Sequence, residues 1–314
     1  METAARYPAE IMATAVVPWT ADWQLDERLF RRELEQLLAS GYRHIYIFGT
    51  AGEGYAVDDA QFLTITRVYA EAVRAGDVEP MVGVISLALS TIIARIEAAR
   101  ELGVRRFQIS LPSWGALEAD EVRQFFDAVL GRFTDCEFLH YNLPRVKRLV
   151  TPAEYATIAA DYPNLVATKN STDAMTRVRG LLEEAPMLRH FLTETGYAYG
   201  SQIGSCGLLI SAASTNATTA RVFFEAGQTR DAATVWRMEG ELRQVVQALL
   251  RAVGEGAYID GAYDKVLWKL HDPEFPLRLL RPYRAARADA ADILAAYLQE
   301  HLPHWAPSPG AVAD

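Results

Sequence analysis

The sequence has little of what would mark a disulfide-stabilised, membrane-spanning or nucleic-acid-binding protein. It contains two cysteines in 314 residues, which are too few for a disulfide framework. No segment approaches the roughly 20 consecutive apolar residues that cross a bilayer, and residues 1–10 lack the apolar core of an export signal. The formal net charge of −9 disfavours nucleic acid or an anionic membrane surface as a partner. We therefore expect a cytoplasmic protein that binds neither nucleic acid nor membranes.

Short apolar segments of strand length alternate with longer amphipathic segments along most of the chain. Half of the residues are hydrophobic, enough for a large core, and the length fits two medium domains or one large barrel. The expected strands are Ile11–Val17, His44–Phe48, Met81–Ile85, Phe107–Leu111, Glu137–Tyr141, Leu165–Thr168, Arg189–Leu192 and Gly207–Ser211. Strands that alternate with helices indicate a parallel sheet, and about eight such units predict an α/β fold of the (β/α)8, or TIM, barrel type.

A doubly wound sheet is the alternative fold. Such a sheet usually has a glycine-rich dinucleotide-binding turn after its first strand, and Pro18-Trp19-Thr20 stands there instead. We expect the barrel to span residues 1–227. A C-terminal helical extension is expected over residues 228–302, and the proline-containing residues 303–314 are expected to form a disordered tail. The three helices of the extension are expected at Thr229–Val253, Ala262–Leu270 and Leu279–Leu298.

Lys169 ends the sixth expected strand, and its position needs an explanation. A barrel has its active site at the carboxyl ends of its strands, and a charged lysine is costly in an apolar interior. We expect burial to lower the pKa of Lys169 and so to expose a nucleophilic amine, which Schiff-base chemistry with a carbonyl compound requires. The alternative is a lysine that only extends its ammonium group from the strand end into solvent.

Two other strand ends carry groups that could act beside this lysine. Gly49-Thr50-Ala51-Gly52-Glu53-Gly54 follows the second strand, and the backbone N–H groups of such a segment can converge on an anion. The segment could equally be a structural turn. Tyr141 ends the fifth strand, where an aromatic side chain could simply fill the barrel. Two further residues are expected to be structural: His140 should point toward the helix layer, because successive strand residues alternate in direction, and Glu53 should organise its loop.

Taken together, these segments resemble the dihydrodipicolinate synthase/N-acetylneuraminate lyase superfamily of class I aldolases. The resemblance rests on Gly49-Thr50-Ala51-Gly52-Glu53, Tyr141-Asn142-Leu143-Pro144 and Lys169, which follow in that order at the ends of the second, fifth and sixth strands. It extends from about Ile11 to Leu270, and Gly207–Ser211 and Lys265–Trp268 also fall where that family has similar stretches.

The resemblance implies a lyase that forms a Schiff base and needs no metal or other cofactor. Lys169 would attack the ketone of pyruvate or another 2-oxo acid, and Tyr141 would transfer protons. The residues implied to bind the 2-oxo acid are Gly49, Thr50, Ala51 and Ile210. The resemblance also implies a homotetramer or a homodimer.

The chain departs from the synthases of this family at the second-substrate end of the site. Trp114, in Leu111-Pro112-Ser113-Trp114-Gly115, stands where those synthases have a tyrosine of a proton relay, and an indole cannot replace a phenol. It resembles instead the tryptophan of hydratase-aldolases that cleave arylidene-pyruvates, or it packs at a subunit contact. Arg145 follows the strand-five proline, but without the Ser-Arg-Thr-Gly context of the synthases. We expect Trp114 and Arg145 to contact the second substrate.

The expected function is therefore a class I aldolase that makes or breaks a carbon–carbon bond with pyruvate or another 2-oxo acid, and an aromatic aldehyde is one candidate for the second substrate. The alternatives within the family are a 4-hydroxy-tetrahydrodipicolinate synthase and a keto-deoxy sugar acid dehydratase. A non-catalytic protein that binds a 2-oxo acid is the alternative of a different class.

Overall fold

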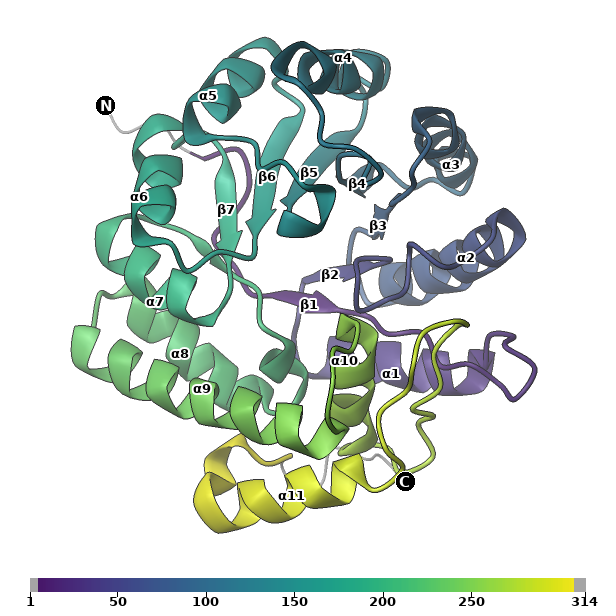
Figure 1. Ribbon diagram of the computed structural model, residues 1–314, viewed down its shortest axis with the longest axis vertical. Helices are drawn as coiled ribbons and strands as arrows, with labels where there is room; N and C mark the ends of the chain where they lie inside the picture. Colours follow the sequence, from purple (N-terminus) through teal and green to yellow (C-terminus); the bar gives the residue numbers. More distant parts are fainter. Residues whose placement is uncertain (1–4, 308–314) are drawn as a thin grey trace.

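The computed structural model describes residues 5–307, which form a parallel β-barrel surrounded by helices (Figure 1). The eight strands are β1 (Met12–Thr14), β2 (His44–Ile47), β3 (Met81–Gly83), β4 (Arg106–Ile109), β5 (Glu137–Asn142), β6 (Leu165–Asn170), β7 (Arg189–Leu192) and β8 (Gly207–Leu208). They pair in sequence order and all run parallel. A parallel bridge between Ile11 and Leu208 joins the last strand to the first. The predicted barrel is confirmed.

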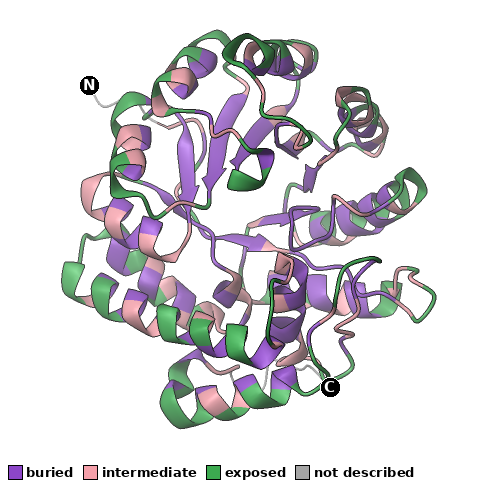
Figure 2. Cartoon of the chain, in the orientation of Figure 1, coloured by how far each residue is buried: buried purple, intermediate pink, exposed green. Residues whose placement is uncertain are grey.

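A helix follows each strand and packs its apolar face on the outside of the barrel. These helices are α1 (Glu27–Ala39), α2 (Asp59–Ala75), α3 (Leu89–Glu101), α4 (Ala119–Leu130), α5 (Pro152–Asp161), α6 (Met175–Glu184), α7 (Glu194–Ile203) and α8 (Ala217–Gln228). Their inner faces are buried and their outer faces exposed (Figure 2). In α1, for example, the Asp26 side chain caps the first turn, and Phe30, Leu34 and Leu37 recur at helical spacing on the buried face.

A separate cluster of apolar side chains fills the barrel interior. Its members are Tyr7, Met12, Tyr46, Met81, Leu139, Val166, Ala167, Phe191 and Leu209. Gly207 leaves room for this packing, because a Cβ atom there would lie 2.5 Å from the ring of Phe191. The filled interior forms an apolar floor, so the polar groups that act on a substrate have to lie at the carboxyl ends of the strands.

Three helices follow the barrel units: α9 (Ala232–Val253), α10 (Asp260–Lys269) and α11 (Ala290–His301). Helix α9 packs against α7, α8, α10 and α11. The third helix begins eleven residues later than predicted, at Ala290 rather than Leu279. The segment before it packs on the barrel instead, where the side chains of Leu279 and Leu280 are buried and the N–H of Leu280 donates a hydrogen bond to the Glu53 side chain. None of the helices in residues 5–307 is both long enough and apolar enough to cross a membrane.

The prediction of a disordered tail from residue 303 is wrong for its first residues. Pro303–Trp305 form a 3₁₀ helix, and the Trp305 side chain is fully buried. Its indole Nε1 donates a hydrogen bond to Glu241 Oε2 at 3.1 Å. The buried side chain of Trp305 thus holds Pro303–Trp305 against the fold, although the proline content of this segment suggested disorder. Residues 308–314 of the predicted tail lie outside the described residues.

A buried ion pair joins the loop after β2 to α10. Lys265 Nζ lies 2.5 Å from Glu53 Oε1, and neither side chain is exposed. The same carboxylate accepts hydrogen bonds from Trp19 Nε1 and from the backbone N–H of Leu280, each at 2.7 Å. A buried carboxylate is stable only when it is paired and hydrogen-bonded in this way. Glu53 therefore organises its loop, as predicted.

Breaking this pair should destabilise the fold. Lys265→Met would leave the Glu53 carboxylate buried without a counter-charge, which typically costs about 3–5 kcal/mol. We expect a large fall in the urea-unfolding midpoint, followed by tryptophan fluorescence. The control is Arg179→Met, which removes the exposed ion pair between Arg179 and Glu183 and should leave the midpoint nearly unchanged. Equal shifts in the two variants would contradict the anchoring role of the Glu53–Lys265 pair.

Candidate active site

Lys169 lies at the carboxyl end of β6 with its ammonium group between two phenol side chains. The residue is 6% exposed, so it does not extend into solvent. Its Nζ donates a hydrogen bond to Tyr46 Oη at 2.9 Å and lies 4.0 Å from the centre of the Tyr141 ring. Tyr141 is the residue paired with Lys169 across β5 and β6. Strands β2, β5 and β6 thus each contribute one polar group to a single point at the barrel mouth.

Tyr46 is the residue at this point that sequence analysis missed. In the short apolar strand β2 it looks like one more core residue, and it is indeed only 1% exposed. Gly49 makes room for it, because a Cβ atom at Gly49 would lie 2.6 Å from the Tyr46 ring. The sequence holds a weak signal, a strand tyrosine followed by a glycine three residues later. That signal does not show which group the phenol contacts.

The two phenols change the pKa of the lysine. Burial lowers the pKa of Lys169, but charge interactions with Tyr141 and Tyr46 and the hydrogen bond to Tyr46 outweigh it, so the pKa is raised above its ordinary value. The prediction of a lowered pKa is therefore wrong, because it considered burial without the neighbouring phenols. Burial also raises the pKa of Tyr46, with Lys169 opposing this shift. The resting lysine is thus an ammonium ion, which has to lose a proton before it can attack a carbonyl carbon.

A cavity of about 230 Å³ opens beside Lys169. It brings together four of the residues predicted to form the site: Ala51, Tyr141, Lys169 and Ile210. One wall of the cavity is apolar and comes from α9 and α10, through Val245, Val246, Leu249, Leu250 and Leu267. Acidic residues also line it, namely Glu194, Asp260 and Asp264. A small ligand in this cavity would meet the lysine at one end and carboxyl groups at another.

Thr50, Trp114 and Arg145 line a second cavity, of about 360 Å³, instead of the cavity beside Lys169. The Trp114 side chain is largely in solvent, with the residue 83% exposed. The Arg145 guanidinium binds both carboxylate oxygens of Asp260, at 2.7 and 3.2 Å. Asp260 lines the first cavity, so this ion pair lies where the two cavities meet. Gly49 lines neither cavity.

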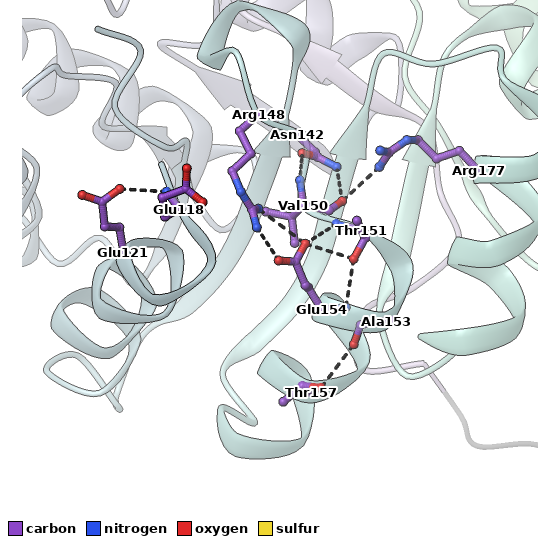
Figure 3. Close-up of polar contacts among 10 residues, drawn as sticks. All are labelled: Glu118, Glu121, Asn142, Arg148, Val150, Thr151, Ala153, Glu154, Thr157 and Arg177. Atoms are coloured by element: carbon purple, nitrogen blue, oxygen red, sulfur yellow. Dashed lines mark hydrogen bonds and ion pairs between the residues drawn. The ribbon is translucent and has the colours of Figure 1, made fainter. Parts of the chain in front are cut away.

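Side-chain hydrogen bonds fasten the loop that follows Tyr141 (Figure 3). Asn142 Nδ2 donates to the carbonyl oxygen of Val150, and Asn142 Oδ1 accepts from the N–H of Val150, both at 3.0 Å. These two bonds close the loop at its base. Glu154 then accepts hydrogen bonds from the backbone N–H of Thr151, at 2.8 Å, and from Arg148 (Figure 3). The strand end that carries Tyr141 is therefore held in a fixed position.

His140 points away from the cavity, as predicted. Its Nδ1 lies 2.6 Å from Tyr155 Oη on α5. Burial lowers the pKa of His140 to about 3, so the ring is neutral. A neutral imidazole in the helix layer takes no part in proton transfer at Lys169.

Comparison with known proteins shows which family the chain belongs to. The sequence model of the dihydrodipicolinate synthetase family matches residues 7–278. A 4-hydroxy-tetrahydrodipicolinate synthase from Exiguobacterium sibiricum is 23% identical over 288 residues, which cover 89% of this chain and 94% of that protein.

Solved structures share the fold at lower identity. YagE of E. coli K12, a dihydrodipicolinic acid synthase family protein in complex with pyruvate, superposes with a TM-score of 0.81 at 17% identity, covering 94% of this chain and 98% of that one. N-acetylneuraminate lyase from Mycoplasma synoviae superposes with a TM-score of 0.78 at 18% identity, covering 93% and 97%. The family match spans the barrel as far as α10, which confirms the resemblance seen in the sequence. The chain belongs to the dihydrodipicolinate synthetase family and is a carbon–carbon lyase of the class I aldolase superfamily.

Proposed function

We propose that this lyase forms a Schiff base between Lys169 and pyruvate or another 2-oxo acid, and makes or breaks a carbon–carbon bond at the neighbouring carbon. The observation that carries the proposal is the buried amine of Lys169, held against two phenols at the mouth of a cavity. A protonated imine draws electrons from the neighbouring carbon, which can then lose a proton and become an enamine. The enamine attacks an aldehyde, and the reverse sequence cleaves the bond.

The turn after β2 supplies the carboxylate-binding part of the site. Its shape is preset, because the N–H of Glu53 donates to the carbonyl oxygen of Thr50 and the N–H of Gly54 to that of Gly49. Ala51 lines the cavity beside Lys169, and Thr50 lines the adjoining one. We assign Thr50 and Ala51 to the carboxylate of the 2-oxo acid, while Ile210 packs on its apolar part and Gly49 gives Tyr46 its space.

The two phenols have different roles in this mechanism. Tyr46 touches the ammonium group directly and holds Nζ at the cavity mouth. Tyr141 presents its ring to Nζ and lines the cavity, where its hydroxyl can move protons as the carbinolamine loses water and as the carbon–carbon bond forms. The proton that Lys169 has to lose can pass to Tyr46 Oη as Tyr46 gives its own hydroxyl proton to Thr14, with which it shares a hydrogen bond.

A 4-hydroxy-tetrahydrodipicolinate synthase is the second candidate, because the matched curated relatives carry that name. That reaction requires a pocket for a dicarboxylate, and here the Arg145 guanidinium is already bound to Asp260. An aromatic aldehyde would reach Trp114 if it extended into the second cavity. The exposure of Trp114 also supports a contact with another copy of the chain, in a homotetramer or a homodimer.

The lysine can be tested directly. Incubation with pyruvate and borohydride should add a reduced pyruvyl group to the wild type, detected by intact-mass spectrometry. Lys169→Ala should not carry the adduct, because it has no amine at the cavity mouth. Lys147→Ala, which removes a lysine that donates to the carbonyl oxygen of Trp114, should carry it fully. An unmodified wild type would contradict Schiff-base chemistry and favour a binding protein or another reaction.

The tyrosine that pairs with Lys169 should matter for turnover more than for adduct formation. Tyr141→Phe keeps the ring beside Nζ and loses the hydroxyl, so borohydride trapping should persist. Turnover should fall by about 10² to 10⁴-fold, the usual effect of losing a proton-transfer group. The measurement is the rate of aldehyde-dependent pyruvate consumption. Unchanged turnover would remove Tyr141 from the mechanism.

The influence of Tyr46 can be measured through the titration of Lys169. Tyr46→Phe keeps the lysine buried but removes an interaction that raises its pKa, so the pKa should fall. Each unit of the fall gives about tenfold more free amine at a fixed pH. Competitive acetylation followed by peptide mapping reports this pKa. Tyr42→Phe is the matched control, because Tyr42 is a buried tyrosine that donates to the carbonyl oxygen of Ala213. A Lys169 titration that is identical in Tyr46→Phe and the wild type would contradict this account.

A further inference from the structure

The part of the Lys169 cavity formed by the C-terminal helices is acidic. Asp260 and Asp264 of α10 and Glu194 of α7 line it, and Lys169 is the one cationic side chain among its described lining residues. Helix α10 approaches the barrel mouth closely, because a Cβ atom at Gly261 would lie 3.0 Å from the carbonyl oxygen of Ala51. The carboxyl groups of α10 therefore belong to the same small space as the reacting amine.

Asp264 is a buried carboxyl group that forms no direct ion pair with a described residue. The residue is 5% exposed, and its side chain shares a hydrogen bond with Ser211. Within residues 5–307, no lysine, arginine or histidine forms an ion pair with it, whereas the equally buried Glu53 lies 2.5 Å from Lys265 Nζ. Asp260 differs as well, because Arg145 neutralises it. Asp264 thus faces the cavity without a direct ion pair, and the Lys169 ammonium in the same cavity is the cation whose charge acts to lower its pKa.

A buried carboxylate without a positive partner is unstable, so the group has to bind a proton or meet a cation. Burial, and next the charge of Asp260, raise the pKa of Asp264 to about 7. Burial also raises the pKa of Glu194. Once Lys169 has become a neutral enamine it no longer supplies a positive charge to the cavity, so an ionised Asp264 would then favour a positively charged second ligand and disfavour a second carboxylate.

We propose that Asp264 contacts the second substrate and selects an aldehyde that carries a positive charge on an apolar body. The apolar part would pack on Val245 and Leu249 of α9, and the cationic group would lie beside Asp264. An acceptor with a carboxylate would be rejected by the same group. This inference rests on the proposed function, because it takes the enamine on Lys169 as the first partner.

The test compares aldehydes of different charge, two of which have the same shape. The probes are betaine aldehyde, its uncharged isostere tert-butylacetaldehyde, and succinic semialdehyde, which carries a carboxylate. With pyruvate as the donor, the wild type should show a kcat/KM for betaine aldehyde at least about tenfold above that for the isostere, and succinic semialdehyde should be the poorest. The preference should grow as the pH rises through about 7, because Asp264 then becomes negative.

Variants assign the preference to one residue. Asp264→Asn keeps the shape and the capacity to hydrogen-bond with Ser211, and should reduce the preference about tenfold and remove its pH dependence. Asp264→Glu should retain both. Glu183→Gln, at an exposed position of α6, is the control with unchanged selectivity. The other titratable groups that line the cavity are Tyr46, Tyr141, Lys169, Glu194, Asp260 and Tyr263. A pH dependence that survives in Asp264→Asn would assign the preference to one of them and overturn the proposal.

The outcomes separate this inference from the proposed function. Borohydride trapping with pyruvate needs no second aldehyde, so a wild type without an adduct overturns the Schiff-base mechanism itself. A wild type that forms the adduct but uses the cation and its isostere equally well overturns only the role of Asp264. If Asp264→Asn does not fold, a wild type whose preference for the cation is absent or does not change with pH still overturns the proposal.

Discussion

The buried ion pair between Glu53 and Lys265 determines where the groups of the active site stand. Glu53 lies two residues beyond Ala51, in the turn assigned to the carboxylate of the substrate. Lys265 lies one residue beyond Asp264, on the helix that closes the cavity. Successive helix residues point about 100° apart. A lysine directed into the barrel loop therefore turns its neighbour, Asp264, toward the cavity, and one electrostatic contact positions both ends of the site.

Two lysines at the barrel mouth, Lys169 and Lys265, are buried, and they differ in the groups that accept their hydrogen bonds. Lys265 is held by the Glu53 carboxylate and the carbonyl oxygen of Arg278, both fixed acceptors, and it does not line the cavity. Lys169 is held by a phenol and faces the cavity. An ionised carboxylate only accepts hydrogen bonds, whereas a phenol both accepts and donates them, so it can follow an amine through changes of protonation. The first arrangement stabilises the fold, and the second leaves the amine able to react.

The sequence predicted the features that arise from alternation along the chain and missed those that depend on tertiary contacts. Strand and helix periodicity was sufficient for the barrel. Strand ends pointed to Lys169, Tyr141 and the turn that contains Ala51, and the family resemblance added Ile210; these four residues line one cavity. Tyr46 was not predicted as a site residue, because in the sequence a tyrosine inside a short apolar strand is indistinguishable from a core residue. Its contact with Lys169 spans 123 positions of sequence. Together with the charge interaction of Tyr141, that contact reverses the predicted direction of the lysine pKa.

The remaining differences have the same origin. The ion pair of Arg145 with Asp260 joins residues 115 positions apart, so nothing near Arg145 in the sequence shows that its charge is already matched. Because Asp260 and Asp264 lie on α10, the barrel pattern does not include them. The proposed chemistry thus resides on β2, β5 and β6, while the acidic and apolar sides of the cavity, which we propose meet a second substrate, come from α7, α9 and α10. Since Lys169 donates its hydrogen bond to Tyr46 of β2 and not to these helices, the second substrate can change through substitutions on the helices while Lys169 keeps its two phenols.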